Sequence, residues 1–175
     1  MELINPLQRK ILQILSSRPE SELFYLAGGT ALSAFYLKHR QSRDLDFFTT
    51  EENAVVPFSF VLERMLVDSG CRVQRSRSFP SFAELLVKEL QNETVVQFAV
   101  DSPYRIAPVV VEEKEIPGLR VDNLADLAAN KLLALFGRAM VRDFIDIYFV
   151  VTENHFTWDE LIQNARKKDP GFNLY

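Results

Sequence analysis

Hydrophobic residues along the first two thirds of the chain follow two different periods. Near the start they recur every three or four residues, as on one face of an amphipathic helix. The apolar run from Leu23 to Ala27 and the alternating segment from Asp44 to Thr49 have the lengths and patterns of strands. The expected elements are a helix over residues 3–15, a strand over 23–27, a helix from Thr30 to about Lys38, a strand over 44–49, a helix from Pro57 to Gly70 with Phe60, Val61, Met65 and Leu66 on its apolar side, and strands over 71–78, 83–90 and 94–100 with Asn92 and Glu93 in the turn between the last two.

The pattern becomes helical in the last third of the chain. Helices are expected over residues 124–137, 141–151 and 158–168, after a loop over 105–117. An α/β part followed by helices favours the α+β class, with a mixed β-sheet flanked by helices and a helical C-terminal part. We expect residues 1–121 to form the α/β core and residues 122–175 to pack on it in a single compact unit.

Composition narrows the class of protein. The chain has 175 residues, of which 47% are hydrophobic, and this suits a globular domain. A lone cysteine, Cys71, excludes a disulfide framework, and no apolar run is long enough to cross a membrane. The charged residues among the first fifteen argue against a signal peptide, so we expect a cytoplasmic protein.

The balance of charge excludes a strongly basic protein that coats nucleic acid, because the net charge is −4. Three local basic clusters still leave room for an RNA partner, although such clusters are more often solvated faces. They lie at Lys38–Arg43, where His39 is expected to be structural or to face RNA, at Arg72–Arg77, and at Arg166–Lys168.

Two glycines separate the first expected strand from the helix that follows it. Gly28 and Gly29 would let a ligand approach the backbone closely, and a helix that begins there would present unpaired N–H groups to a phosphate. The Thr30 hydroxyl could bind the same phosphate. The alternative is an ordinary strand-to-helix turn with Thr30 as the N-cap.

Two acids on the next strand share one face. Asp44 and Asp46 are separated by one residue, so their carboxylates lie about 7 Å apart on the same side. Such a pair can hold Mg²⁺, which binds one or two carboxylates together with substrate phosphates. The alternative is a solvated edge strand. One helix connects the glycine turn to this strand, so the two features can lie side by side, as phosphoryl or nucleotidyl transfer requires.

These features resemble the nucleotidyltransferase superfamily typified by DNA polymerase β and, more narrowly, the AbiEii/AbiGii toxin-type nucleotidyltransferases. The resemblance implies a Mg²⁺-dependent enzyme that transfers a nucleotide from an NTP to an RNA such as tRNA or to a protein side chain. It also implies the toxin of a toxin–antitoxin or phage-defence system, with a cognate antitoxin as partner. The segments that carry it are Gly28–Leu32, His39–Phe48, Asp101–Arg105, Asp126–Arg138 and Arg142–Tyr148.

Charged residues on the C-terminal helices extend the candidate site. Lys131 and Arg138 lie two turns apart on one stripe of an otherwise apolar helix, and a triphosphate would pair with both. A lysine that reaches water over its neighbours is the alternative. The resemblance adds Asp126 to the catalytic residues and assigns Arg142 and Asp143 to nucleotide binding. Locally, Asp146 lies four residues after Arg142 and three after Asp143, so the alternative is an intrahelical ion-pair set in which Arg142 is the cation.

Two positions depart from the family pattern. Met140 stands where an arginine is expected, and Arg138 could compensate for it. Gln97 stands where the family carries a third carboxylate, and a neutral amide cannot act as a general base. Asp101 or Glu84 could substitute for that carboxylate. Otherwise the protein is a catalytically degenerate module that binds nucleotide or RNA or serves in an interaction; a phosphotransferase on the same scaffold is a further alternative.

Overall fold

The computed structural model describes residues 3–153 and 155–173. Its centre is a mixed β-sheet in the order β3-β4-β5-β2-β1-β7-β6. In the middle of this sheet, β2 pairs antiparallel with β1 and parallel with β5. The α+β prediction is confirmed. The strands are β1 (Tyr25–Ala27), β2 (Asp44–Thr49), β3 (Arg72–Phe79), β4 (Phe82–Glu89), β5 (Asn92–Val100), β6 (Val110–Val111) and β7 (Arg120–Val121).

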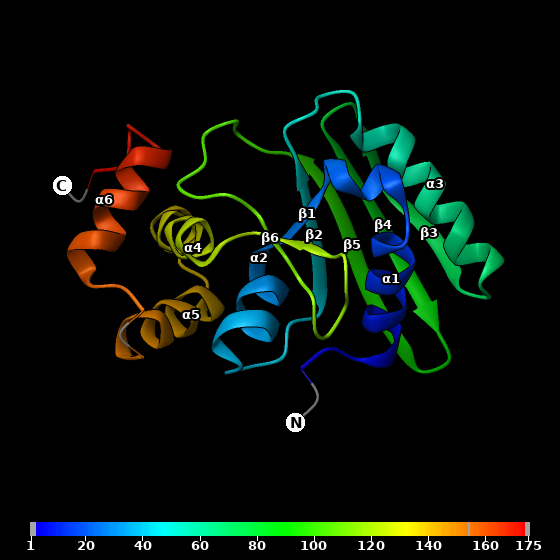
Figure 1. Ribbon diagram of the computed structural model, residues 1–175, viewed down its shortest axis with the longest axis horizontal. Helices are drawn as coiled ribbons and strands as arrows, with labels where there is room; N and C mark the ends of the chain where they lie inside the picture. Colours follow the sequence, from blue (N-terminus) through cyan, green and yellow to red (C-terminus); the bar gives the residue numbers. More distant parts are fainter. Residues whose placement is uncertain (1–2, 154, 174–175) are drawn as a thin grey trace.

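Helices cover the sheet unevenly (Figure 1). On one side, α1 (Pro6–Ser16) and α3 (Val55–Asp68) pack on the strands. At the other end of the molecule, α4 (Leu124–Arg138), α5 (Val141–Thr152) and α6 (Trp158–Lys168) form a helical group. Between sheet and group, α2 (Gly28–Thr30) continues as a π-helix over Ala31–Leu37 and contacts both α4 and α5. A 3-10 turn, Pro19–Leu23, connects α1 to β1.

Strict alternation along β2 sorts its side chains between core and site. Leu45 and Phe47 are fully buried, and Phe47 stacks on Phe98 of β5. Consecutive side chains of a strand point to opposite faces. Asp44 and Asp46 are therefore directed to the other face, away from the aromatic core. The hydrophobic pattern of a single strand thus determines where two acids meet the helical group.

The expected hydrophobic face of α3 was confirmed at Leu66, which is fully buried, and was wrong at its first two positions. Phe60 and Val61 are exposed, whereas Phe58 and Leu62 are buried. The helix begins at Val55, two residues before Pro57. Proline is tolerated within the first turn of a helix, so it did not mark the first residue.

The expected turn between the last two large strands was also wrong. Asn92 and Glu93 belong to β5 and pair with Glu89 and Lys88. The turn itself contains Leu90, which adopts a positive φ of 52°. A bulky residue rarely takes this left-handed conformation, so the residue types did not indicate a turn at Leu90. The segment expected as loop, 105–117, also contains the short strand β6.

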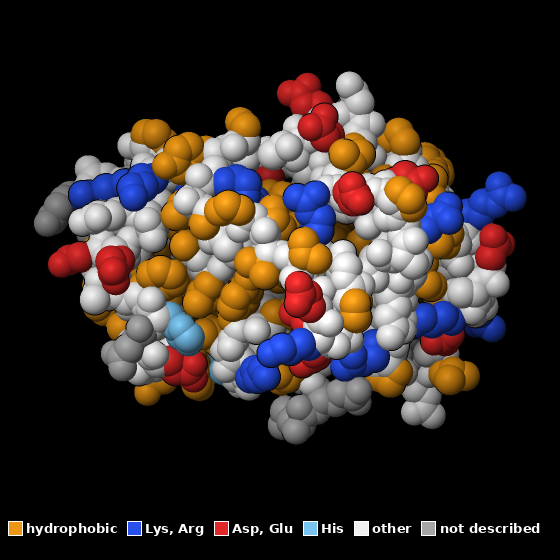
Figure 2. All heavy atoms as spheres, in the orientation of Figure 1, with side chains coloured by type: hydrophobic (Ala, Val, Ile, Leu, Met, Phe, Trp, Pro, Cys, Tyr) orange, Lys and Arg blue, Asp and Glu red, His pale blue; other side chains and the backbone are white. Residues whose placement is uncertain are grey.

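One face of the molecule is drawn in Figure 2. Hydrophobic side chains gather on it between the C-terminal helices and the π-helix, and charged side chains lie mainly around them. Within the described ranges, none of the helices combines the length and the apolar character needed to span a bilayer.

Candidate active site

The glycine turn and the acidic strand are in direct contact. Gly28 has φ +64°, and a Cβ built on it would lie 2.0 Å from Oδ2 of Asp46. A Cβ on Gly29 would lie 2.8 Å from the Ser42 hydroxyl and 2.9 Å from an Arg40 guanidinium nitrogen. Real Cβ atoms do not approach other atoms this closely. A side chain at either position would therefore displace a neighbouring side chain of the segment that carries the acids, and the predicted side-by-side arrangement is present.

The two acids of β2 repel each other, and burial disfavours the charged form of Asp46. Burial, followed by repulsion from Asp44, raises the pKa of Asp46 to about 6. Lys131, Arg142 and Arg138 act in the opposite direction without cancelling the shift. A guanidinium nitrogen of Arg142 lies 3.7 Å from Oδ2 of Asp44. An additional cation beside these carboxylates would therefore relieve a real electrostatic cost.

Lys131 does not reach out to water. Its Nζ lies 3.0 Å from Oδ1 of Asp143 and 3.0 Å from Oδ2 of Asp146, and its side chain is only 8% exposed. Arg138, by contrast, is half exposed and donates two hydrogen bonds to Asp143, of 2.9 and 3.1 Å. Two buried carboxylates of α5 therefore hold both cations of the α4 stripe in place.

These α5 carboxylates remain ionised despite their burial. Burial opposes the charge of Asp143, but hydrogen bonds from Arg138 and Lys131 outweigh it and lower its pKa below the ordinary value. Burial likewise opposes the charge of Asp146, whose pKa is lowered further by hydrogen bonds from Arg40 and His39 and by Lys131. His39 is buried against Asp146 and Phe149, so its role in this fold is structural.

Two connected cavities lie over this face of the sheet. The first, the candidate catalytic cavity, has a volume of about 230 Å³ and contains both acids of β2. A second cavity, of about 370 Å³, shares five lining residues with it and adds the apolar walls Phe48, Leu127 and Ala134 and the Asn130 amide. The catalytic cavity is lined by Gly28, Gly29, Arg40, Ser42, Asp44, Asp46, Gln97, Lys131, Arg138 and Arg142.

Three of the predicted site residues do not line these cavities. Thr30 is fully buried, and its hydroxyl donates to the backbone carbonyl of Asp44. Asp143 lies behind Lys131 and Arg138 as their anchor. Asp126 accepts hydrogen bonds from the Lys168 ammonium at 2.6 Å and from the backbone N–H groups of residues 106 and 107, so it connects α4 to α6 and to the preceding loop.

Gln97 is engaged with a neighbouring strand. Its Nε2 donates to Oε2 of Glu84 at 2.7 Å, because β5 places it opposite Glu84 on one side and opposite Asp46 on the other. Asp101, the other possible substitute, accepts a 2.5 Å hydrogen bond from the Tyr25 hydroxyl. Neither acid joins the pair of β2: the described residues contain no cluster of three His, Cys, Asp or Glu side chains able to hold a metal.

The carboxylates present fit a Mg²⁺ ion that is also bound by substrate phosphates. Asp44 and Asp46 supply two carboxylates to one cavity. Mg²⁺ commonly binds through one or two carboxylates plus substrate phosphates and water, so a third acid is not required for binding. Gly28 and Gly29 line the same cavity. The residues therefore fit a metal that arrives with its substrate.

Sequence reasoning missed several residues that line the cavities, of which four are polar or lie on β2. Arg40 and Ser42 lie in the turn before β2, where only the cluster of charge was noticed. Phe48 has the same parity on β2 as Asp44 and Asp46, and the period of the strand could have identified it. Asn130 directly precedes Lys131, and nothing in the sequence distinguishes it.

This combination of sheet, glycine turn and paired acids places the chain in the nucleotidyltransferase fold class. A solved structure of MenT4, the nucleotidyltransferase toxin Rv2826c from Mycobacterium tuberculosis H37Rv, has the same fold, with a TM-score of 0.64 and 20% identity over 91% of this chain and 61% of that one.

The family follows from the sequence comparison. The profile of the family described as "Nucleotidyl transferase AbiEii toxin, Type IV TA system" matches residues 10–109 and 93–171, and the chain belongs to this family. It is 31% identical to the uncharacterized protein aq_aa25 of Aquifex aeolicus (strain VF5), over 92% of this chain and 73% of that protein. The crystal structure of JHP933 from Helicobacter pylori is similar, with a TM-score of 0.61 and 27% identity over 90% of this chain and 69% of that one.

Proposed function

We propose that this member of the AbiEii family is a Mg²⁺-dependent nucleotidyltransferase that moves a nucleotide from an NTP to an acceptor hydroxyl, on an RNA such as tRNA or on a protein side chain. One observation carries the proposal: a single cavity contains two carboxylates, a glycine turn and a set of cations. Catalysis of phosphoryl and nucleotidyl transfer consists mainly of positioning and charge neutralisation, and this cavity supplies both.

The cations of the cavity would bind the triphosphate. Lys131 and Arg138 stand on one stripe of α4, and Arg142 approaches from the start of α5. Asp44 and Asp46 would hold Mg²⁺, and when bound the ion would lower the charge on the phosphates and the pKa of the attacking hydroxyl. The acceptor hydroxyl oxygen forms a bond to the α-phosphorus, the bond from that phosphorus to the bridging oxygen breaks, and pyrophosphate leaves. The hydroxyl proton passes to water.

The second cavity suits the nucleoside. Phe48, Leu127 and Ala134 supply apolar walls for a base, and Asn130 supplies an amide that can donate and accept hydrogen bonds. It opens onto the catalytic cavity through shared residues, so a nucleotide can extend through both. Asp143 would act as a positioning residue, because it orients Lys131 and Arg138 without lining either cavity.

A non-catalytic nucleotide-binding module is the second candidate. The observation that favours it is Gln97, a neutral residue at the third acidic position that is bonded to Glu84. A toxin role, a cognate antitoxin as partner and a cytoplasmic location belong to the same proposal as the enzyme, and membership of the toxin family supports the first two.

Transfer of label separates the two candidates. The protein is incubated with each α-³²P-labelled NTP, Mg²⁺ and total RNA, and RNA and protein fractions are then examined. We expect label in one fraction, abolished by Asp46→Asn and by Lys131→Ala and unchanged in the exposed control Glu52→Gln. Nucleotide binding without transfer under any condition would support the module instead.

A further inference from the structure

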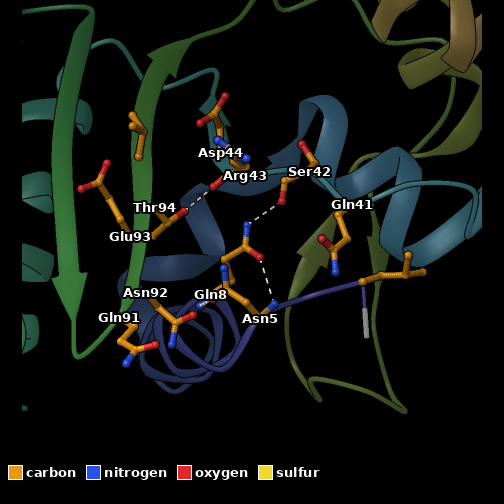
Figure 3. A pocket seen from close by; sticks show the side chains of 12 residues that line it. Asn5, Gln8, Gln41, Ser42, Arg43, Asp44, Gln91, Asn92, Glu93 and Thr94 are labelled. Atoms are coloured by element: carbon orange, nitrogen blue, oxygen red, sulfur yellow. Dashed lines mark hydrogen bonds between the residues drawn. The ribbon is translucent and has the colours of Figure 1, made fainter. Parts of the chain in front are cut away.

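A third cavity adjoins the catalytic cavity at Asp44. It has a volume of about 660 Å³, and it shares Ser42 and Asp44 with the catalytic cavity. The second cavity, which we propose for the nucleoside, extends from the catalytic cavity toward Phe48. The third cavity therefore lies beside Asp44 at the start of β2, where the first turn of α1 and the β4–β5 turn also line it. Figure 3 shows the third cavity, with Asp44 and Arg43 at its upper edge.

The position of this cavity suits an acceptor. In nucleotidyl transfer the attacking and leaving oxygens stand roughly in line across the phosphorus. If the nucleotide extends from the catalytic cavity toward Phe48, the acceptor must reach the acids from another direction. The third cavity leads to Asp44 directly.

Amide side chains are the most frequent kind among the residues that line it. The described residues that line it include Asn5, Gln8, Gln41, Gln91 and Asn92, and Arg43 is the one cation among them. An amide presents a donor and an acceptor together, and asparagine and glutamine use this pair to read the edges of bases. A cleft with one arginine and two acids, Asp44 and Glu93, does not supply the density of positive charge that a duplex backbone requires.

The floor of the cavity is fixed, and one edge of it is available. Gln8 donates from Nε2 to the Ser42 carbonyl at 2.9 Å and accepts from the Asn5 N–H at 3.1 Å (Figure 3). Thr94 donates to the Arg43 carbonyl. In contrast, the side chains of Gln91 and Asn92 form no hydrogen bond with any other residue between 3 and 173 that the structure describes.

The available amides follow a strained turn. Leu90 has a φ of 52° and is 98% exposed, at the tip of the β4–β5 turn. A non-glycine residue is disfavoured in this conformation, so the backbone is strained at the point where the chain turns into the cleft. Gln91 and Asn92 come directly after it and line the cavity.

From these observations we infer that the amide-lined cleft binds the unpaired terminal nucleotides of the RNA strand that carries the acceptor hydroxyl, with Gln91 and Asn92 bonded to a base edge. The inference rests on the proposed nucleotidyl transfer and adds the acceptor's binding site and the unpaired state of the bases bound there. Unpaired bases are accessible on their edges, and protein side chains recognise them there. Gln8 and Thr94 act by holding the segment before Asp44, so that bound RNA and catalytic acid keep a fixed relation.

The experiment compares Asn92→Ala and the double variant Gln91→Ala/Asn92→Ala with Gln74→Ala, which removes an exposed amide from β3 outside the cleft. Binding of a fluorescent single-stranded RNA is measured by anisotropy without NTP, and the same strand is then used as acceptor, alone or in a blunt duplex. The cleft variants should weaken binding and raise the acceptor KM about tenfold, the worth of one or two hydrogen bonds. The NTP KM and the Gln74→Ala variant should not change, and the blunt duplex should bind more weakly than the single strand.

Unchanged RNA binding in the double variant would overturn the inference, as would label that enters protein while RNA does not bind. Failure of the proposed function has a different signature. In that case the wild-type protein transfers label to no acceptor, while the anisotropy comparison still decides whether the cleft binds RNA.

Discussion

Replacement of Asp46 by asparagine should stabilise the metal-free protein. The pKa of this carboxyl is raised from 3.8 to about 6, chiefly by burial and then by Asp44. A difference of about two pH units corresponds to about 3 kcal/mol, at 1.36 kcal/mol per unit. The charged form is therefore the unfavourable one in the folded state. Asn has nearly the same shape without the charge, and the Asp46 carboxylate has no hydrogen-bond donor among the described residues.

The sign of the pH dependence follows from linkage. A raised carboxyl pKa means that the folded protein holds its proton more tightly, so stability falls as pH rises from about 4 to about 6 and the whole cost is present above that window. In EDTA at pH 8, Asp46→Asn should therefore gain about 2–3 kcal/mol in free energy of unfolding. At pH 4 the gain should be less than about 1 kcal/mol.

Urea denaturation followed by circular dichroism measures this difference, with Glu52→Gln as the control that removes an exposed negative charge elsewhere. Mg²⁺ adds a second arm. A cation at the paired acids relieves their repulsion, so Mg²⁺ should stabilise the wild-type protein and leave Asp46→Asn unaffected. A variant that is less stable than wild type at pH 8 in EDTA, or a gain independent of pH, would refute the reasoning.

Three further predictions concern the same cavity. The exchange Gln97→Glu/Glu84→Gln keeps the hydrogen bond and moves the carboxylate to the third acidic position, so Mg²⁺ should bind more tightly in calorimetry and transfer should be faster. Gln97→Glu alone should lower Tm, because two carboxylates then meet, and a Tm equal to that of wild type would contradict this. Gly28→Ala should cost at least about 1–2 kcal/mol in urea and abolish transfer, because its φ is +64° and its Cβ would displace Asp46; retained transfer would exclude the close approach. Asp143→Asn should lower the free energy of unfolding by about 3 kcal/mol and raise the NTP KM, since Lys131 and Arg138 lose their anchor. Because the pKa of Asp143 is lowered in the folded state, the stability difference is present above about pH 4 and disappears as pH falls further. A stability difference that persists in acid would count against this reasoning.

Local patterns in the sequence predicted the elements that build the site. The alternation from Asp44 to Thr49 predicted both the bounds of β2 and the shared face of its acids, because period 2 is a property of the strand itself. The glycine pair predicted that another group approaches the backbone closely, but the expected group was a ligand, whereas the side chain of Asp46 lies against Gly28. The last helix, Trp158–Lys168, was also placed correctly.

Contacts between distant segments could not be predicted in the same way. Lys131 was expected to face a triphosphate or water, but it lies between two carboxylates of α5, and the sequence contains no signal for how α4 packs on α5. Asp126 was assigned by resemblance, whereas its partner Lys168 lies 42 residues away on α6. Thr30 has the residue type of an N-cap and is instead used to hold β2.

Parallel reactions with α-³²P-ATP and γ-³²P-ATP, repeated for the other NTPs, test the central claim most directly. If the paired acids and the cations of α4 and α5 serve nucleotidyl transfer, label from the α-position enters the acceptor and label from the γ-position is released as pyrophosphate. Transfer of the γ-label to the acceptor, with the α-label remaining on a nucleoside diphosphate, would contradict the account and identify a phosphotransferase.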